Sequence, residues 1–496
     1  MILQRIARLY AGRTVGWVER SETHHPKPSR TRHRKLALAA LLLGFAALNP
    51  TCGWALDLMT VWQAALTHDP AYAAARAARD AGLTQTRQAD ALWRPALALQ
   101  AGAGIAHVDS ATRGARFAAP GFGSVDGGVD FDTAIDSGAM TSATIELRQP
   151  LFNRERDAEA EQLRLGARQA ELAWNDAQAD LILRTAQGYF DLALAGEQLR
   201  LIERQLDAVT RAQTEAQDRF DLGDRPITDV HEATARLQSL RAQQLAAEVQ
   251  CQLRRAALAD LTGLTLAETE PLALPTRLPD DIDIGELAPW LDRVTAQAPL
   301  VRAAETGLNN ARQQARKSEL ALSPNVDLVA RAGRERISGD GDFGRASNRQ
   351  TEGMVGVQIT LPLDLGGGRS ARHDEAAAKI AQAQAELDHA RQQALNQARA
   401  AWLGLSVGRA QVAALEAAAQ ASAARLDATR TGHEIGERTT LDLLNAENDA
   451  AAAQLALTQT RVQVQLDGLR LARLAGALDE PRLRRLQESL RAGPPP

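Results

Sequence analysis

The chain has 496 residues, of which 45% are hydrophobic but only 4% aromatic, and it carries a formal net charge of −4. Alanine supplies much of the apolar content, and alanine combines the highest helix propensity with a small side chain, so the composition favours long, closely packed helices over a thick globular core. Without residues 1–55, which hold nine basic and two acidic residues, the net charge is −11, and this excess of negative charge argues against nucleic acid as a partner.

The first 55 residues have the organisation of an export signal. Basic residues precede an apolar stretch at residues 36–48, which is too short to cross a bilayer. Gly53-Trp54-Ala55 then supplies the small residues of a cleavage site, so we predict a cleaved signal peptide at residues 1–55, with an uncleaved anchor as the alternative. The sequence has no uninterrupted apolar run of about 18 residues, so an exported chain of this kind is either soluble or part of a β-barrel.

The rest of the sequence repeats itself at a nearly fixed offset. Proline, glycine and aspartate stay in register between the two halves, which two unrelated alanine-rich stretches would not do. The pairs that match at an offset of 229 or 213 residues include Pro70 with Pro299, Pro95 with Pro324, Gly223 with Gly436, Asp229 with Asp442 and Ala233 with Ala446.

This repetition predicts the domain organisation. We expect a first structural repeat at residues 56–263, a linker at 264–286, a second repeat at 287–476 and a C-terminal tail at 477–496. Each repeat has the same plan, with a helix, two strands, a very long helix, a glycine turn and a second helix.

The predicted strands are short and separated by loops. Segments rich in glycine and polar residues at 109–139 and 338–350 predict flexible, exposed loops between paired strands. The four predicted strands cover residues 96–108, 141–152, 325–337 and 353–363.

Side chains alternate along these strands between apolar and polar residues. Ile145 and Leu147 share one predicted face, whereas Glu146 and Arg148 share the other. Four strands do not close a barrel, because known outer-membrane barrels begin at about eight strands and an open edge in lipid leaves backbone groups unpaired. If the strands span a membrane, several copies of the chain must therefore share them. The alternative is an antiparallel sheet packed on the helices of a soluble protein.

Long helical hairpins are predicted at residues 154–262 and 369–475. Between Leu181 and Val209, apolar or small residues recur at alternating steps of four and three. This period of about 3.5 residues indicates supercoiled helix packing. Gly223 and Gly436 interrupt the two helical patterns and predict the hairpin turns.

The ordered set of landmarks resembles the TolC family of outer-membrane efflux and secretion channels. The resemblance covers about residues 56–476 and implies a mainly α fold with a small transmembrane β part. It implies a duplicated α-helical coiled-coil barrel with four β-strands per chain, and a twelve-stranded barrel that a homotrimer completes. The residues that carry it are Asp69-Pro70, the strand ends Gln149-Pro150-Leu151-Phe152 and Leu361-Pro362-Leu363, and the turns at Gly223 and Gly436.

The resemblance also implies a place and a function. It implies a protein of the cell outer membrane with a long periplasmic extension, which serves as a conduit for type I protein secretion or tripartite efflux. The implied partners are outer-membrane lipid, a periplasmic adaptor (membrane fusion) protein and an inner-membrane ABC or RND transporter. A toxin-secretion branch resembling CyaE, with export of a cytolysin or haemolysin, is open beside drug and metal efflux.

The same resemblance assigns roles to the hairpin turns. Gly223 and Gly436 would form the periplasmic tip that docks the adaptor. A ring of acidic side chains just inside the tip maps to Asp442. The second acidic position of that ring is Asn445 in this sequence, which would halve the formal charge of the ring.

Links between the two hairpins would close the tunnel. The resemblance maps them onto Arg438 with Thr228 and Asp229, and onto His433. An exposed pair of this kind contributes about 1 kcal/mol or less, which suits a gate that an adaptor opens. The alternative is that Asp229 and Asp442 only cap their helices, since aspartate is a favoured capping residue.

No sequence pattern indicates a catalytic, cofactor or metal site. His231-Glu232 lacks the second histidine of a zincin motif, because Ala235 stands at that position. We therefore predict a protein that is not an enzyme and has no cofactor. The competing class is a soluble periplasmic coiled-coil scaffold or adaptor protein, which would share the heptads but would need neither the amphipathic strands nor the duplication.

Overall fold

The computed structural model describes residues 56–119, 123–224, 226–266, 272–278, 285–341, 344–363, 366 and 368–491. All of them belong to one compact unit, Ala55–Pro496. The predicted signal peptide at residues 1–55 lies outside the described residues. In the described parts of the chain, no helix combines the length and the apolar content that a bilayer crossing needs.

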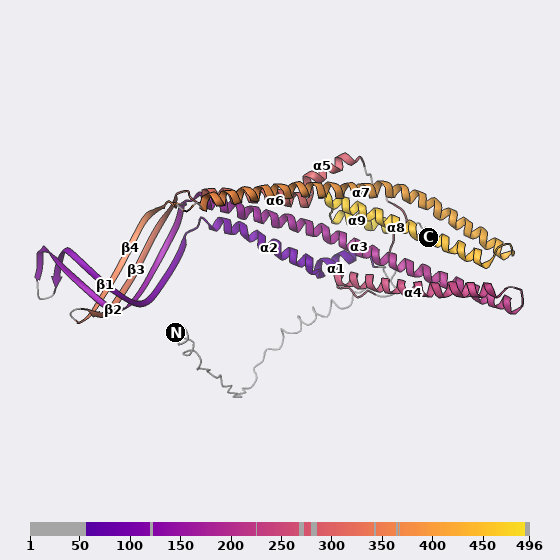
Figure 1. Cartoon of the computed structure of the whole chain (residues 1–496), viewed down its shortest axis with the longest axis horizontal. Coiled ribbons are helices and arrows are strands. Elements are labelled where there is room, and N and C mark those ends of the chain that lie inside the picture. Colours follow the sequence, from indigo (N-terminus) through magenta and orange to yellow (C-terminus); the bar gives the residue numbers. More distant parts are fainter. Residues whose placement is uncertain are drawn as a thin grey trace, which may run out of the picture. The chain divides into compact units, whose positions relative to one another are not determined.

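Long helices dominate the described residues, and a β-hairpin interrupts them in each repeat (Figure 1). The helices are α1 (Leu58–His68), α2 (Pro70–Ala91), α3 (Arg154–Asp221), α4 (Ile227–Thr262), α5 (Leu287–Gln297), α6 (Pro299–Leu320), α7 (Gly368–Glu434), α8 (Thr440–Leu474) and α9 (Glu480–Arg491). The strands are β1 (Ala96–Ala119), β2 (Gly123–Phe152), β3 (Asn325–Gly341) and β4 (Gly344–Thr360). With 68 and 67 residues, α3 and α7 are each about 100 Å long.

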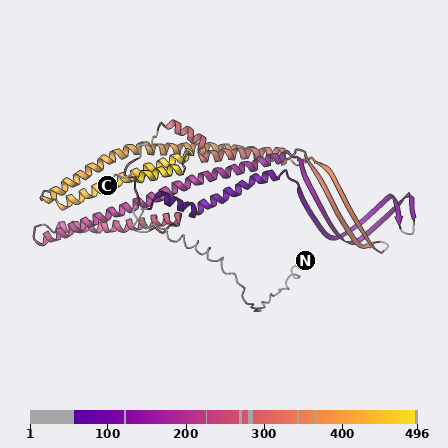
Figure 2. The ribbon, with the colours of Figure 1, turned by 180° about the vertical axis from the view of Figure 1, so that it is seen from behind.

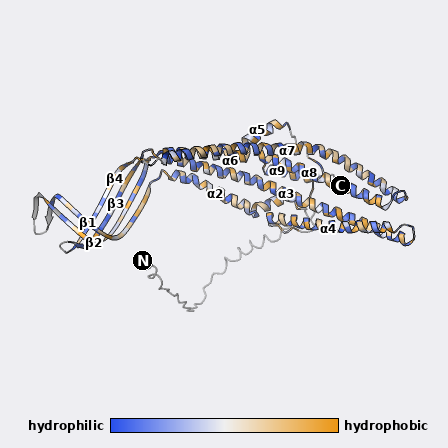
Figure 3. Cartoon of the chain, viewed as in Figure 1, coloured by the Kyte–Doolittle hydropathy of each residue, from blue (hydrophilic) through white to orange (hydrophobic). Residues whose placement is uncertain are grey.

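The strands form one antiparallel sheet in the order β1-β2-β3-β4. Leu97 pairs with Leu147, and Leu147 pairs with Ala330, so these side chains share one face. Glu146 points to the opposite face, where the Arg331 guanidinium donates to its carboxylate at 2.6 Å. The predicted alternation of apolar and polar side chains is confirmed, and Figure 3 shows the two kinds intermixed along the strands.

The strands are longer than predicted. The segments predicted as exposed loops, residues 109–139 and 338–350, are mostly strand in the structure. That prediction was wrong because glycine and aspartate give a local turn signal, whereas ladder bonds to a neighbouring strand satisfy the backbone whatever the side chains are. In contrast, β4 ends at Thr360, short of its predicted end, because Pro362 has no N–H to donate to a ladder.

Helices from the two repeats lie side by side in one layer (Figures 1 and 2). Next to the sheet the order is α2-α3-α6-α7, and towards the hairpin turns it is α4-α3-α8-α7. Helices α3 and α7 run through both levels. As a result, α2 and α4 form one edge of the layer and α7 forms the other.

Small residues let the helices approach one another closely. A Cβ at Gly408 would come within 2.5 Å of Val464, and a Cβ at Gly404 would overlap Asp467. The buried side of α7 is built largely from alanine, as the composition predicted. Its buried alanines are Ala376, Ala383, Ala390, Ala394, Ala398 and Ala401.

Helix α9 lies where only a C-terminal tail was predicted. Its Leu483 is fully buried in the core that also holds α1. The Leu58 N–H donates a 2.8 Å hydrogen bond to the buried Gln487 Oε1, and Arg491 lies 2.6 Å from Asp57. The C-terminal segment therefore holds the first helix of the first repeat in place.

We expect Leu483→Ala to lower the free energy of unfolding by about 2–5 kcal/mol, because it leaves a cavity in the core. Arg484→Ala is the matched control, because this side chain is 61% exposed and its ion pair with Glu480 contributes less than about 1 kcal/mol. Urea titration followed by helical circular dichroism measures both. Equal effects of the two substitutions would show that α9 is not part of the folded core.

Candidate functional site: the hairpin turns and the charge network

The two predicted turns have the same backbone geometry. Gly223 and Gly436 have φ angles of +78° and +81°, a region that favours glycine. The Gly223 N–H donates to the Phe220 carbonyl at 2.8 Å, and the Gly436 N–H donates to the His433 carbonyl at 3.0 Å. In both turns the next residue bonds back over five positions, as in the usual helix end with a left-handed glycine. The residues involved are related by the offset of 213 residues.

The helices that follow the two turns begin differently. Helix α8 starts with a capping box, in which the Asp442 N–H donates to Thr439 Oγ1 and the Thr439 N–H donates to Asp442 Oδ2, both at 3.1 Å. The bonds from Thr439 hold the pKa of Asp442 below its usual value, and the charge of Arg438 lowers it further. Helix α4 starts at Pro226 without a side-chain cap. At the matching position, Asp229 makes no side-chain hydrogen bond to another described residue.

A groove of about 180 Å³ separates the ends of the two hairpins. Arg219 and Asp229 line the wall formed by α3 and α4, and Thr439 and Leu441 line the wall formed by the start of α8. Buried apolar residues join the three helices close by, namely Val209, Ala212, Leu237, Leu240 and Leu444. The hairpin ends thus meet through an apolar contact beside a groove that both apolar and charged side chains line.

The predicted closure residues lie near these ends, but a single chain does not pair them. His433 Nε2 lies 3.2 Å from Thr440 Oγ1 in its own hairpin. Among the described residues, no hydrogen bond or ion pair joins Arg438 to Thr228 or Asp229. The predicted links stay a prediction.

The predicted acidic ring maps to the first turns of α8. Asp442 is half-exposed and Asn445 is exposed, and their spacing of three residues places them on one side of the helix. Of these two positions, only Asp442 carries a carboxylate. The role of these residues in gating stays a prediction.

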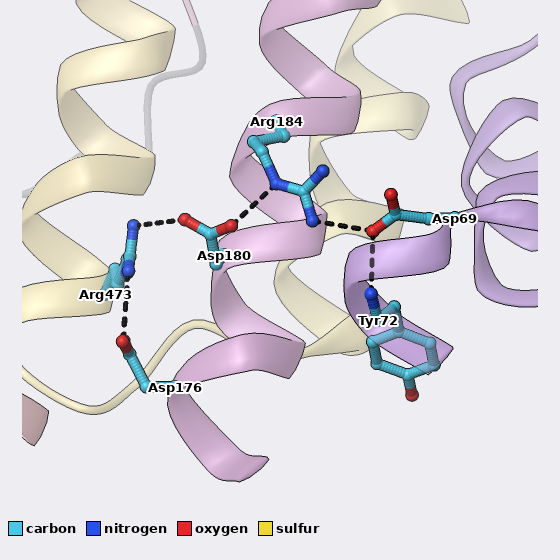
Figure 4. Close-up of polar contacts among 6 residues, drawn as sticks. All are labelled: Asp69, Tyr72, Asp176, Asp180, Arg184 and Arg473. Carbon is cyan, nitrogen blue, oxygen red and sulfur yellow. Dashed lines mark hydrogen bonds and ion pairs between the residues drawn. The ribbon is translucent and has the colours of Figure 1, made fainter. Parts of the chain in front are cut away.

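A network of charged residues joins the two repeats, and sequence analysis did not predict it (Figure 4). Arg473 of α8 donates to Asp176 at 3.1 Å and to Asp180 at 2.7 Å, both on α3. Arg184 donates to Asp180 at 2.6 Å and to Asp69 at 2.7 Å. Alternating charges therefore connect the second repeat to the residue that caps α2.

Three members of this network, Asp69, Arg184 and Arg473, are held in their charged forms. Burial raises the pKa of Asp69, which is 5% exposed, but the hydrogen bond and charge of Arg184 outweigh burial and leave the pKa lowered. In the same way, burial lowers the pKa of Arg473, but Asp176 and Asp180 outweigh it and leave that pKa raised. Asp69 also accepts a 3.1 Å bond from the Tyr72 N–H, so one carboxylate serves the helix cap and the network.

The network residues of the first repeat have no charged counterparts in the second. At the corresponding positions the second repeat has uncharged residues, and α6 begins without a side-chain cap. The matches are Ala298 for Asp69, Gln393 for Asp180 and Gln397 for Arg184. The comparison of the two repeats used features that both share. It therefore could not indicate a network whose residues occur in only one of them.

The sequence matches the family of outer membrane efflux proteins at residues 61–264 and 290–477. These two ranges correspond to the two repeats and together cover most of the chain. The chain belongs to this family.

Individual relatives agree with the family match. The chain is 27% identical over 459 residues to the proteases secretion protein PrtF of Dickeya chrysanthemi, covering 92% of this chain and 96% of that protein. It is 26% identical over 438 residues to the outer membrane protein TolC of Vibrio cholerae, covering 86% and 92%. The fold is similar to the outer membrane channel CmeC of Campylobacter jejuni, with a TM-score of 0.68 and 18% identity over 88% of this chain and 89% of that one.

The family membership confirms the main predictions made from the sequence. The protein is a TolC-type outer-membrane channel protein of secretion and efflux, with a helical periplasmic extension and a small β part. The family is not enzymatic.

We expect Arg184→Gln to lower the free energy of unfolding near neutral pH by about 1–3 kcal/mol, because the buried Asp69 carboxylate loses its charged partner. In the unsubstituted protein the pKa of Asp69 is lowered from 3.8, so its stabilising contribution is present above about pH 4 and is lost as pH falls through the folded pKa. In the variant, burial acts without the Arg184 charge, so the pKa of Asp69 is higher than in the unsubstituted protein. Acid should therefore lower the free energy of unfolding of the variant by less than that of the unsubstituted protein. Urea titrations at about pH 3 and about pH 6 measure both effects.

Arg204→Gln is the control for this experiment, because the Arg204 side chain is 68% exposed and pairs with Glu197 on the helix surface. It should leave both the stability and its pH dependence unchanged. A variant at Arg184 with the pH dependence of the parent protein would contradict the role of the network.

Proposed function

We propose that the protein forms a homotrimeric conduit through the outer membrane and the periplasm for type I protein secretion or tripartite efflux. The open edges of the sheet carry this proposal. Within the described residues, β1 pairs only with β2 and β4 pairs only with β3. Each unpaired backbone group in lipid costs several kcal/mol. Pairing β1 of one copy with β4 of the next removes both edges, and three copies supply twelve strands, within the range of known barrels.

The two faces of the sheet fit this arrangement. On one face, Leu99, Val355 and Ile359 are 76%, 76% and 69% exposed in the single chain. Lipid would cover them in the barrel. The opposite face, which carries the Glu146–Arg331 pair, would then line a water-filled lumen.

The edges of the helical layer also carry apolar side chains. On α4, Leu245, Val249 and Leu253 follow one another at steps of four and are more than half exposed. On α7, Leu403 and Val407 are 51% and 61% exposed and are also four residues apart. Exposed apolar stripes of this kind mark contact surfaces.

The two stripes lie at the same height along the layer. Gly408 of α7 lies against Val464 of α8. Val464 matches Cys251 of α4 at the offset of 213 residues, so the two residues are equally far from their hairpin turns. The stripe at residues 403–407 therefore lies at the same distance from the hairpin turns as the stripe at residues 245–253. In a ring of identical copies, the two stripes of neighbouring chains can then meet.

The proposal includes the route and the partners. Residues 1–55 would direct export and then be removed. The tips at Gly223 and Gly436 would dock a periplasmic adaptor, which would connect the channel to an inner-membrane ABC or RND transporter. TolC-family channels work with partners of these kinds. The exposure of both turns and the groove between the hairpin ends support this placement.

We expect Val249→Cys combined with Val407→Cys to form disulfides between copies in isolated outer membranes, because α4 of one copy would lie against α7 of the next. Each copy then carries both halves of the bond, so oxidation closes a covalent ring of three chains. Electrophoresis without reductant measures the product. Cys251→Ser provides a background without the buried native thiol.

Each single cysteine variant is the control. In the proposed ring, a cysteine on α4 faces α7 of the next chain and not its α4, so a variant with one cysteine should form no disulfide between copies. Covalent products confined to dimers, or growing without limit, would contradict a closed ring of three. A protein that stays monomeric in the periplasm would instead support the soluble scaffold.

We expect Arg438→Ala to raise the conductance of the channel in planar bilayers, because it removes the predicted link to Thr228 and Asp229. Since an exposed link contributes about 1 kcal/mol or less, losing one per copy should shift the gate towards the open state. Arg430→Ala is the control, because Arg430 is also half-exposed and pairs with Asp427 and Glu447 of its own hairpin. An unchanged conductance after Arg438→Ala would remove Arg438 from the gate.

A further inference from the structure

Three arginines lie together on the apolar face of the sheet, and they are here called the arginine cluster. Ala330 of β3 pairs with Leu147 and shares the apolar face with it. Arg334 and Arg336 follow four and six residues later without a register shift, so they project from this same face. Arg349 of β4 pairs with Arg336 and therefore lies on this face as well.

The three side chains are close enough to bind one group. Directly paired residues of a sheet have Cβ atoms about 5 Å apart, and diagonal neighbours are about 7 Å apart. Arg336 and Arg349 are a direct pair, and Arg334 is the diagonal neighbour of Arg349. All three are exposed, and none forms an ion pair or a side-chain hydrogen bond with another described residue. Since like charges opposite each other destabilise a sheet, an anion between these arginines would remove that cost.

Acidic residues of the same strands do not compensate the cluster. Glu335 alternates with the two arginines of β3, so it points to the polar face. Asp340 lies on the apolar face, but it pairs with Arg345 and is about 14 Å along the strand from Arg336. Residues 96–106 of β1, which would lie beside β4 in the proposed barrel, contain no charged residue. The cluster therefore keeps its positive charge on a face that is otherwise largely apolar.

The cluster lies at the end of the apolar face that is far from the helices. Ile359, next to the helical end of β4, is 69% exposed. Arg349 is ten residues away, which is about 34 Å along the strand and about 26 Å along the membrane normal at a strand tilt of about 40°. The apolar band of a membrane barrel is about 25 Å tall. Arg336 and Arg349 therefore lie at the level of the outer head groups.

Phosphate is the anion that fits these side chains at this level. An arginine on the lipid face of a barrel is costly at the bilayer centre but is tolerated near the interface. Its apolar stem can lie along lipid while the guanidinium reaches the head groups, which applies to Arg334, one step deeper than Arg336. A guanidinium donates two parallel hydrogen bonds to a phosphate, and such charge-assisted bonds are stronger than neutral ones.

We propose that the arginine cluster binds the phosphate of a lipid head group in the outer leaflet. This rests on the proposed trimer, in which lipid covers the apolar face of the sheet. Arg336 and Arg349 donate to the phosphate oxygens, and Arg334 reaches them from the membrane side. Each trimer has three such sites, one on each copy, and the bound lipids hold β3 and β4 at a fixed depth in the membrane.

The experiment counts the lipids that the full chain retains, using native mass spectrometry. The protein is purified from outer membranes in detergent and mixed with equal amounts of two lipids. Phosphatidic acid has a terminal phosphate, whereas the phosphate of phosphatidylcholine carries a bulky choline cation. We expect the trimer to retain severalfold more phosphatidic acid than phosphatidylcholine. Combining Arg334→Gln, Arg336→Gln and Arg349→Gln should abolish this preference.

The matched control combines Arg204→Gln, Arg211→Gln and Arg241→Gln. It removes the same charge from exposed positions of α3 and α4, outside the sheet, and should leave the lipid preference unchanged. A second variant has lysine at the three positions of the cluster. It keeps the positive charge, so it should still prefer phosphatidic acid, and it tests the site even if the glutamine variant does not assemble.

Two results would overturn the lipid site. One is equal retention of the two lipids by the unsubstituted trimer, and the other is an unchanged preference in the glutamine variant. The same spectra give the number of chains in each particle. A protein that forms no trimer would therefore contradict the proposed function, whereas a trimer without lipid preference would contradict the lipid site alone.

Discussion

Backbone hydrogen bonding in lipid is the constraint on which the other features of this structure depend. Inside a bilayer, only protein satisfies the N–H and C=O groups on both edges of a strand. The duplicated chain supplies four strands whose inner edges are paired and whose outer edges are open. The helical layer is incomplete in the same way, with apolar stripes on α4 and α7 at its edges. One chain therefore has open edges in both its sheet and its helical layer, as expected for one segment of a closed ring of chains.

A layer of long helices needs close contact along its whole length, and this explains the unusual composition. The buried side of α7 is mostly alanine, and Gly404 and Gly408 admit side chains of α8 at close range, so this helix is stabilised by many small contacts. Three of the scarce aromatic residues, Trp62, Tyr189 and Phe190, lie in one core together with α9. There the Tyr189 hydroxyl accepts a hydrogen bond from the Ala273 N–H at 2.9 Å, and burial raises its pKa to about 12. The scarce aromatic residues thus fix the level at which the first helix, the long helices and the C-terminal helix meet.

Features that depend on local chemistry were predictable from the sequence. The turns at Gly223 and Gly436 follow from a left-handed position that favours glycine, and the duplication made both visible. The strands were underestimated because their ladder partners lie far away in the sequence, while glycine and aspartate give a local loop signal. The contact between Leu58 and Gln487 spans 429 residues, and nothing local indicates it.

The candidate site shows the same division. The resemblance to the TolC family supplied every proposed gate residue, and these residues lie beside the repeated turns. It did not predict which of them bond within one chain. It also missed the network around Arg473, because the partners Asp176 and Asp180 lie almost 300 positions away and the second repeat has no counterpart.

The duplication allows the two turn aspartates to be compared directly. Both turns keep the same backbone bonds, so their side chains were free to diverge without loss of the turn. At Asp442, Oδ2 accepts the bonds of the capping box, and Oδ1 accepts none among the described residues. At Asp229, neither oxygen is engaged in capping, because the N-cap residue Pro226 has no N–H to donate. A capping role and a contact with a neighbouring copy are therefore compatible at Asp442, whereas capping does not account for the carboxylate at Asp229.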